Sequence, residues 1–305
     1  MEAALASHRI ATLNHMNLII TVADASYFSH LQLFVASLRE RGAYDGGLVI
    51  VEHGIPREGR VHYEHPFTPE HLEWLESHGA TVLRYGDLIE EAGLLVAQVE
   101  SITTRTRIFP AKQIATTLVC RRFASSFRRV CYFDADTYVQ SRVTGLFDIL
   151  PEEGVAFAPE TRPIVEREWA RSTLSVTDLA SFVPQGAVER RVHPEVQICA
   201  GFFGGSLDAV GRFGLLWLSV GSSRLFQVHS DQPLLNLLVY FFDARIALLQ
   251  EGWVLHLNDL QRERLEFDQS AQQFRYGKHT PRVVHFNGRA RDLRAHVTWL
   301  MRSGE

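Results

Sequence analysis

Two aspartates one residue apart, Asp134 and Asp136, directly follow the apolar run 129–133 (RVCYF). Such a run predicts a buried β-strand, and the ligands of open α/β sheets lie beyond the carboxyl ends of the strands. In an extended chain these two side chains share one face, roughly 6.6 Å apart, so both carboxylates could hold one divalent cation. An oxygen-rich site with open positions suits Mn²⁺, or Mg²⁺ as a second choice, and such an ion would neutralise the charge on a departing diphosphate.

Three other short segments carry polar or small residues where a ligand could bind. His285 lies in the strand-like run 283–286 (VVHF), residues 198–205 (ICAGFFGG) have small side chains, and Asp231 and Gln232 precede a helical pattern. Each has a simpler interpretation. An isolated Asp-x-Asp is common in solvated turns, a histidine in an apolar strand is usually a core residue, and the glycines and Asp231 could serve packing and an N-cap. The position of the two acids after a strand favours the metal interpretation.

The hydrophobic periods along the chain predict the elements that must position these residues. They predict strands at 17–23, 48–52, 80–85, 129–133, 155–158, 198–205, 247–250 and 283–286, and helices at 27–41, 69–78, 112–127, 208–218 and 232–242. The alternation up to residue 133 predicts a parallel, doubly wound sheet.

No composition shift marks a linker, so we expect one domain at 16–305. It would consist of two halves, 16–150 and 151–305, the first of which resembles a nucleotide-binding half-domain. The segment 160–196 is polar, arginine-rich and weakly periodic.

The composition excludes several classes of protein. The formal net charge is −4 and the pI is about 6.4, so no positive field attracts nucleic acid. The three cysteines, Cys120, Cys131 and Cys199, have no paired metal spacing, which predicts buried, reduced thiols and a cytoplasmic protein.

No run of the sequence reaches the roughly 20 apolar residues of a membrane span. Residues 1–15 lack the apolar core of a signal peptide, and we expect them to form a disordered extension.

Taken in order along the chain, six segments resemble the motifs of glycosyltransferase family 8, a retaining group that includes glycogenins and bacterial lipopolysaccharide galactosyltransferases. They are TVADASYF, SITTRTR, YFDADTYV, ICAGFFGG, SDQPLLN and HFNG, and the resemblance covers residues 17 to about 291. It implies a GT-A fold, an α/β architecture with a Rossmann-like, mostly parallel central sheet flanked by helices. It also implies that a hexose is transferred from a UDP-sugar to an acceptor with retention of configuration. The half 16–150 would then bind the nucleotide and the half 151–305 the acceptor and the donor sugar, and we expect the segment 160–196 to shape the acceptor pocket.

The resemblance implies roles for particular residues. Asp134, Asp136 and His285 would be the metal ligands. Asp231 and Gln232 would lie beside the reacting carbon, where Asp231 would stabilise oxocarbenium-like charge and the neutral amide of Gln232 would orient the sugar. The nucleotide and the donor sugar would contact Thr21, Ala23, Asp24, Arg107, Lys112, Ala135, Cys199, Ala200, Gly201, Gly288 and Arg291.

Two departures limit what the resemblance implies. Cys199 stands where the family has an asparagine, so one polar contact to the donor sugar is missing and the identity of the sugar is open. The lysine-proline-tryptophan that follows the family's glycine is absent, and Arg291 stands at the lysine's offset, where it could contact the diphosphate. The segment GFFGG is also similar to transferases of family 6, but HFNG favours family 8.

Two other functions fit parts of the sequence. A sugar nucleotidyltransferase also uses paired carboxylates with a metal, but residues 21–30 (TVADASYFSH) lack its glycine-rich phosphate loop. A catalytically degenerate nucleotide-sugar-binding protein would explain Cys199 and the missing tail motif. The acceptor is unidentified, with a small molecule or soluble saccharide favoured over a membrane lipid, and the sequence does not indicate an oligomeric state.

Overall fold

The computed structural model describes residues 16–106, 110–159, 198–221, 245–250, 252–257 and 264–286, together with Gln232, Leu235 and Leu238. The expected N-terminal extension, 1–15, and the expected acceptor segment, 160–196, lie outside the described residues. Among the described helices, none combines the length and the apolar character that crossing a membrane requires.

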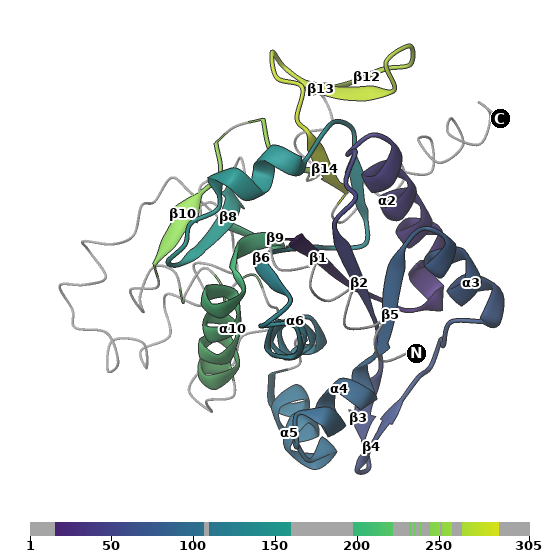
Figure 1. Cartoon of the computed structure of the whole chain (residues 1–305), viewed down its shortest axis with the longest axis vertical. Helices are drawn as coiled ribbons and strands as arrows, with labels where there is room; N and C mark the ends of the chain where they lie inside the picture. Colours follow the sequence, from purple (N-terminus) through teal and green to yellow (C-terminus); the bar gives the residue numbers. More distant parts are fainter. Residues whose placement is uncertain are drawn as a thin grey trace, which may run out of the picture.

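A seven-stranded sheet forms the centre of the molecule, in the order β10-β8-β9-β6-β1-β2-β5 (Figure 1). Its strands are β1 (Met16–Ala23), β2 (Gly47–Glu52), β5 (Ala80–Arg84), β6 (Phe127–Phe133), β8 (Val155–Pro159), β9 (Ile198–Ser206) and β10 (Ile246–Leu248). Strands β6, β1, β2 and β5 are all parallel, whereas β9 runs antiparallel to both of its neighbours, β6 and β8. The mostly parallel sheet that the resemblance implied is confirmed, and the four strands up to residue 133 are parallel, as their alternation with helices predicted.

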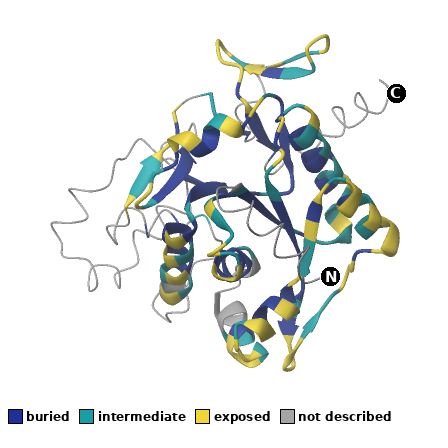
Figure 2. Cartoon of the chain, in the orientation of Figure 1, coloured by how far each residue is buried: buried dark blue, intermediate teal, exposed yellow. Residues whose placement is uncertain are grey.

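Helices cover both faces of this sheet. Helices α2 (Phe28–Glu40) and α3 (Pro69–Ser77) pack on one face, and α4 (Tyr85–Glu91), α5 (Val96–Thr106), α6 (Pro110–Arg122) and α10 (Leu207–Gly221) pack on the other. Successive residues of β6 alternate between the two layers: Cys131 and Phe133 face α2, while Val130 and Tyr132 face α6 and α10. Because both faces are covered, the buried residues concentrate in the sheet and on the inner sides of the helices (Figure 2).

Local sequence signals explain where two of the helices begin and end. At the start of α3 the Thr68 hydroxyl accepts a hydrogen bond from the His71 N–H and the His71 ring accepts one from the Thr68 N–H, with Pro69 at the first helical position. Gly79, at a φ of +70°, then allows the turn into β5. The helix expected at 112–127 ends earlier, at Arg122, because Phe127 already belongs to β6.

A smaller sheet joins two C-terminal strands to the short strand that follows β6 of the central sheet. Its order is β11-β14-β7, formed by β11 (Val254–Leu257), β14 (Val283–Phe286) and β7 (Thr137–Val139). Strand β14 is parallel to β11 and antiparallel to β7, which places His285 between His256 and Thr137. The other described elements are the hairpins β3 (Ile55–Arg57) with β4 (Arg60–His62) and β12 (Leu265–Asp268) with β13 (Gln273–Tyr276), and the 3₁₀ helices η1 (Ala25–Tyr27) and η2 (Thr144–Ile149).

Candidate metal and donor site

The two aspartates lie in the connection between β6 and β7. Strand β6 ends at Phe133, as the sequence predicted, but the chain bends at residues 135–136 and does not stay extended through the two acids. The connection is hydrogen-bonded on two sides. The Asp134 N–H donates to the Gly201 carbonyl at 3.0 Å, and the Phe286 N–H donates to the Asp136 carbonyl at 2.9 Å. Strands β9 and β14 therefore position the acids.

His285 lies next to both carboxylates. Its Nε2 is 3.1 Å from Asp136 Oδ1 and 3.5 Å from Asp134 Oδ2. The structure thus brings together the three side chains that the resemblance proposed as metal ligands, with their ligand atoms all within 4.8 Å of one another. Carboxylate oxygens with one imidazole nitrogen fit a divalent cation such as Mn²⁺ or Mg²⁺. That these residues bind a cation stays a prediction.

The neighbours of His285 determine its protonation. Burial alone would lower the pKa of the imidazole, but the Asp136 carboxylate outweighs burial and holds the pKa of His285 well above its usual range. The ring therefore carries a positive charge while only protein surrounds it. A cation that binds Nε2 has to displace that proton, so the proton occupies the position that a metal ion would take.

A second positive charge contacts the other aspartate. The Nζ of Lys112, on α6, lies 2.9 Å from Asp134 Oδ1 and also donates to the Ala200 carbonyl at 3.1 Å. The Tyr132 hydroxyl donates to the same Asp134 oxygen at 2.8 Å. Lys112, which the resemblance placed at the donor, is thus part of the candidate site. Tyr132 is a contact that the sequence interpretation missed, although it stands two residues before Asp134 on the strand that leads to it.

Strand β9 packs its small residues against His285. A Cβ at Gly201 would lie 2.3 Å from Cε1 and 2.5 Å from Nδ1 of the His285 ring. Among the described residues, the space above this glycine is therefore filled by the imidazole. Cys199, two residues earlier on the same strand, has its Sγ 3.8 Å from His285 Nδ1. Gly201 is required here because a larger residue would push the ring away from the acids.

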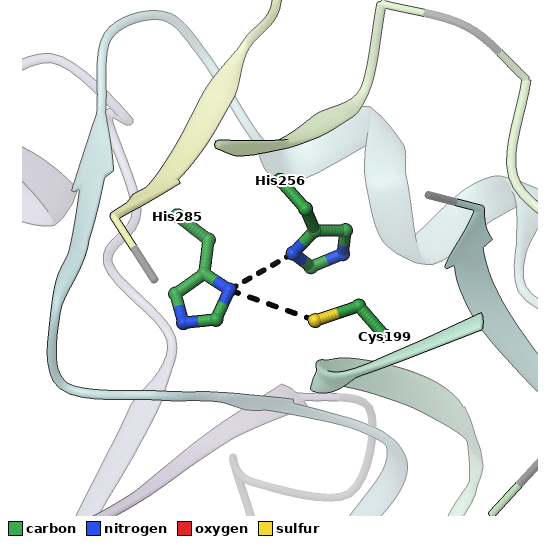
Figure 3. Close-up of side chains that lie close together, drawn as sticks. All are labelled: Cys199, His256 and His285. Carbon is green, nitrogen blue, oxygen red and sulfur yellow. Dashed lines mark hydrogen bonds between the residues drawn. The ribbon is translucent and has the colours of Figure 1, made fainter. Parts of the chain in front are cut away.

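His256 is a further member of this region, and the sequence interpretation missed it. Its Nδ1 lies 2.9 Å from His285 Nδ1, and its side chain is buried (Figure 3). Burial, together with the positive charges of His285 and Lys112, holds the pKa of His256 well below its usual range, so this ring is neutral. The run 254–257 (VLHL) places its histidine at the same point of the strand as the run 283–286 (VVHF), and this similarity could have indicated the pair.

The residues expected to hold the nucleotide lie at the carboxyl end of β1. Since β1 and β6 are parallel neighbours, this end and the two acids lie at the same edge of the sheet. Asp24 accepts a hydrogen bond from the Ser26 N–H at 3.0 Å and so caps η1. Thr21, Ala23 and Ala135 are buried, and the Thr21 hydroxyl has no hydrogen-bond partner within the described part of the chain.

Four of the five remaining expected site residues lie outside the described part of the chain. They are Arg107, Asp231, Gly288 and Arg291. Gln232 is described, in helical conformation and partly buried, and Leu235 and Leu238 of the same predicted helix are helical and buried. The catalytic roles of Asp231 and Gln232 therefore stay predictions.

Known proteins match this chain in structure. No protein-family model matches it, and no match is found among curated proteins. The apo crystal structure of mouse xyloside xylosyltransferase 1 matches with a TM-score of 0.57 at 13% identity, over 90% of this chain and 98% of that one. The apo structure of WbbM, a bifunctional glycosyltransferase, matches with a TM-score of 0.55 at 15% identity, over 94% of this chain and 51% of that one, so this chain spans about half of WbbM. At such identities the likeness shows the fold, which is the GT-A type that the resemblance to family 8 implied.

Proposed function

We propose that this chain is a metal-dependent glycosyltransferase that moves a hexose from a UDP-sugar to a small-molecule or soluble saccharide acceptor, with retention of configuration. The observation that carries the proposal is the cluster of Asp134, Asp136 and His285 beyond the carboxyl end of β6. The GT-A-type fold, found also in a xylosyltransferase and in a bifunctional glycosyltransferase, supports it. A cytoplasmic location is part of the same proposal, since buried thiols suit a reducing compartment.

The chemistry follows from the three metal-ligand side chains and their neighbours. A divalent cation bound by the cluster would neutralise the charge that develops on the departing nucleoside diphosphate. His285 would bind that cation through Nε2, whose proton would pass to solvent, and its Nδ1–H would donate to His256, which would fix the orientation of the ring. Lys112 adds a second positive charge beside the cluster. Charges that are positioned before the reaction in this way are usually the largest contribution to catalysis.

Hydrolysis of the donor, measured with and without added Mn²⁺, tests the proposal. The donors to screen are UDP-glucose, UDP-galactose and their N-acetyl forms, with UDP-xylose added because the similar mouse protein is named for xylosyl transfer. We expect sugar and UDP to be released from at least one hexose donor, and only when Mn²⁺ is present. Release from UDP-xylose alone would contradict the hexose and leave the transferase assignment in place. A protein that binds UDP-sugars but releases no sugar, or that instead forms a nucleotide-sugar and pyrophosphate from a sugar phosphate, would overturn the transferase assignment.

A pair of matched variants tests the metal cluster. Asp136→Asn should lower the Mn²⁺-dependent rate by about 100- to 1,000-fold, because one charged ligand is lost at the developing negative charge. Asp148→Asn makes the same change at an exposed aspartate and should retain the wild-type rate. Far-UV circular dichroism should be unchanged in both. Near-normal turnover of Asp136→Asn would remove the metal from the mechanism.

A further inference from the structure

The His285 ring presents its second nitrogen to a different set of ligand atoms. Its Nδ1 lies 2.9 Å from His256 Nδ1 and 3.8 Å from Cys199 Sγ (Figure 3). The two nitrogens and the sulfur lie within 4.8 Å of one another, and none of the three residues is more than 4% exposed. These atoms come from β14, β11 and β9, so the tertiary structure assembles the set. The aspartates lie at Nε2, on the other side of the ring.

The spacing of these atoms suits a tetrahedral metal ion. Zinc bonds of about 2.0–2.1 Å to nitrogen and about 2.3 Å to sulfur place two nitrogens about 3.3 Å apart and a nitrogen and a sulfur about 3.6 Å apart. The observed separations, 2.9 Å and 3.8 Å, lie within about half an ångström of these values. Small side-chain movements would therefore fill three of the four tetrahedral positions and leave the fourth to a water molecule.

The chemistry of the atoms points to a softer ion than the acidic cluster does. A thiolate and two imidazoles select Zn²⁺ over Mn²⁺ or Mg²⁺, which prefer oxygen ligands. His256 turns its Nδ1 toward the ring of His285, and within the described residues its buried Nε2 has no hydrogen-bond partner. An apolar side chain would avoid burying that nitrogen, so a histidine here needs a reason beyond packing.

We propose that Cys199, His256 and His285 form a second cation site, for Zn²⁺, and that this site competes with the acidic cluster for the ring of His285. A neutral imidazole offers one lone pair at a time. With zinc on Nδ1, the Nε2–H donates to Asp136, the contact seen at 3.1 Å. With a cation on Nε2, the Nδ1–H donates to His256 across 2.9 Å. The two ions therefore exclude each other, whether or not the chain is a glycosyltransferase.

Titration of the metal-free, full-length protein with Co²⁺, a spectroscopic substitute for Zn²⁺, tests the site. We expect a near-ultraviolet thiolate-to-cobalt charge-transfer band together with the intense visible bands of tetrahedral cobalt. The band should disappear in Cys199→Ser and persist in Asp136→Asn, which changes only the acidic side. A wild-type protein without the band would overturn the site and leave His256 as a hydrogen-bond partner of His285.

Two further measurements keep the test independent of how well a variant folds. X-ray absorption at the zinc edge of the wild-type protein should show a sulfur neighbour at about 2.3 Å, and a shell of nitrogen and oxygen alone would refute the site. The electron paramagnetic resonance signal of free Mn²⁺ reports the competition. Zinc should release Mn²⁺ from the wild type at a concentration at least about 10-fold lower than from Cys199→Ser, and equal concentrations would refute the competition.

Sugar release assayed with Mn²⁺ on a cobalt-free portion of each preparation separates this proposal from the proposed function. A preparation that releases sugar but shows no cobalt band would refute the zinc site alone. A preparation with the band but without sugar release would refute the transferase proposal alone.

Discussion

Gly201→Ala is the single substitution that most directly tests the position of His285. The new Cβ would lie 2.3 Å from Cε1, 2.5 Å from Nδ1 and 3.0 Å from Nε2 of the ring, where ordinary contact begins at 3.4 Å. The ring therefore has to move by about 1.1 Å, because the three atoms nearest to the new Cβ all belong to this imidazole. Such a shift would lengthen the 3.1 Å contact with Asp136.

The expected effect has two parts. Overpacking of this kind costs about 1–3 kcal/mol of unfolding free energy, measured by urea denaturation. Misplacing a metal ligand should weaken Mn²⁺ binding by about 10- to 100-fold or more, measured by calorimetric titration. Removing the ring in the double variant Gly201→Ala/His285→Ala should restore part of the lost stability, since the clash is then gone, but it should not restore Mn²⁺ binding.

A second glycine on the same strand provides the control. A Cβ at Gly204 would lie 3.0 Å from Cys131 Sγ and 3.0 Å from the Val130 carbonyl, away from the ring. Gly204→Ala should therefore lower stability and leave Mn²⁺ affinity at the wild-type value. If Gly201→Ala bound Mn²⁺ as tightly as the wild type, His285 could not be a ligand in the position described.

The remaining predictions concern the contacts around the site. Lys112→Met should bind Mn²⁺ several-fold more tightly in the absence of donor, because the ammonium 2.9 Å from Asp134 repels a second cation; unchanged affinity in a paramagnetic resonance titration would contradict this. Tyr132→Phe should lose about 1–2 kcal/mol in urea denaturation as the hydrogen bond to Asp134 disappears, and no loss would mean that water replaces it. Gln140→Leu should cost about 2–4 kcal/mol, because its buried amide bonds the N–H and the carbonyl of Phe274; a wild-type unfolding midpoint would show that β13 is held without it.

The sequence indicated much of the fold and the identity of the acidic residues. The second half of strand β6, residues 130–133, is a continuous apolar run because both of its faces are covered, and its end is marked by the first of the two aspartates. The apolar character of a segment and the spacing of its apolar residues can be read within a few residues, so a buried strand can be predicted from its own sequence. The direction of β9 could not, because buried strands look alike in sequence whether they run parallel or antiparallel to their neighbours.

The expected helix 112–127 shows the same limit at a boundary. Phe127 fits the helical spacing of apolar residues, but in the structure it belongs to β6, because that strand pairs with β1. Tertiary pairing of this kind overrides a local preference.

What the sequence determined by itself was the set of residue types: two acids after a strand, a histidine in a C-terminal strand, and a glycine two residues after Cys199. Only the tertiary structure decided that Lys112 contacts Asp134, that Gly201 makes room for His285, and that His256 stands beside it. These contacts depend on the register of β14 between β11 and β7 and on the packing of β9. A shift of one residue would turn His285 to the other face of its strand, and no local pattern specifies which distant strand a residue will meet.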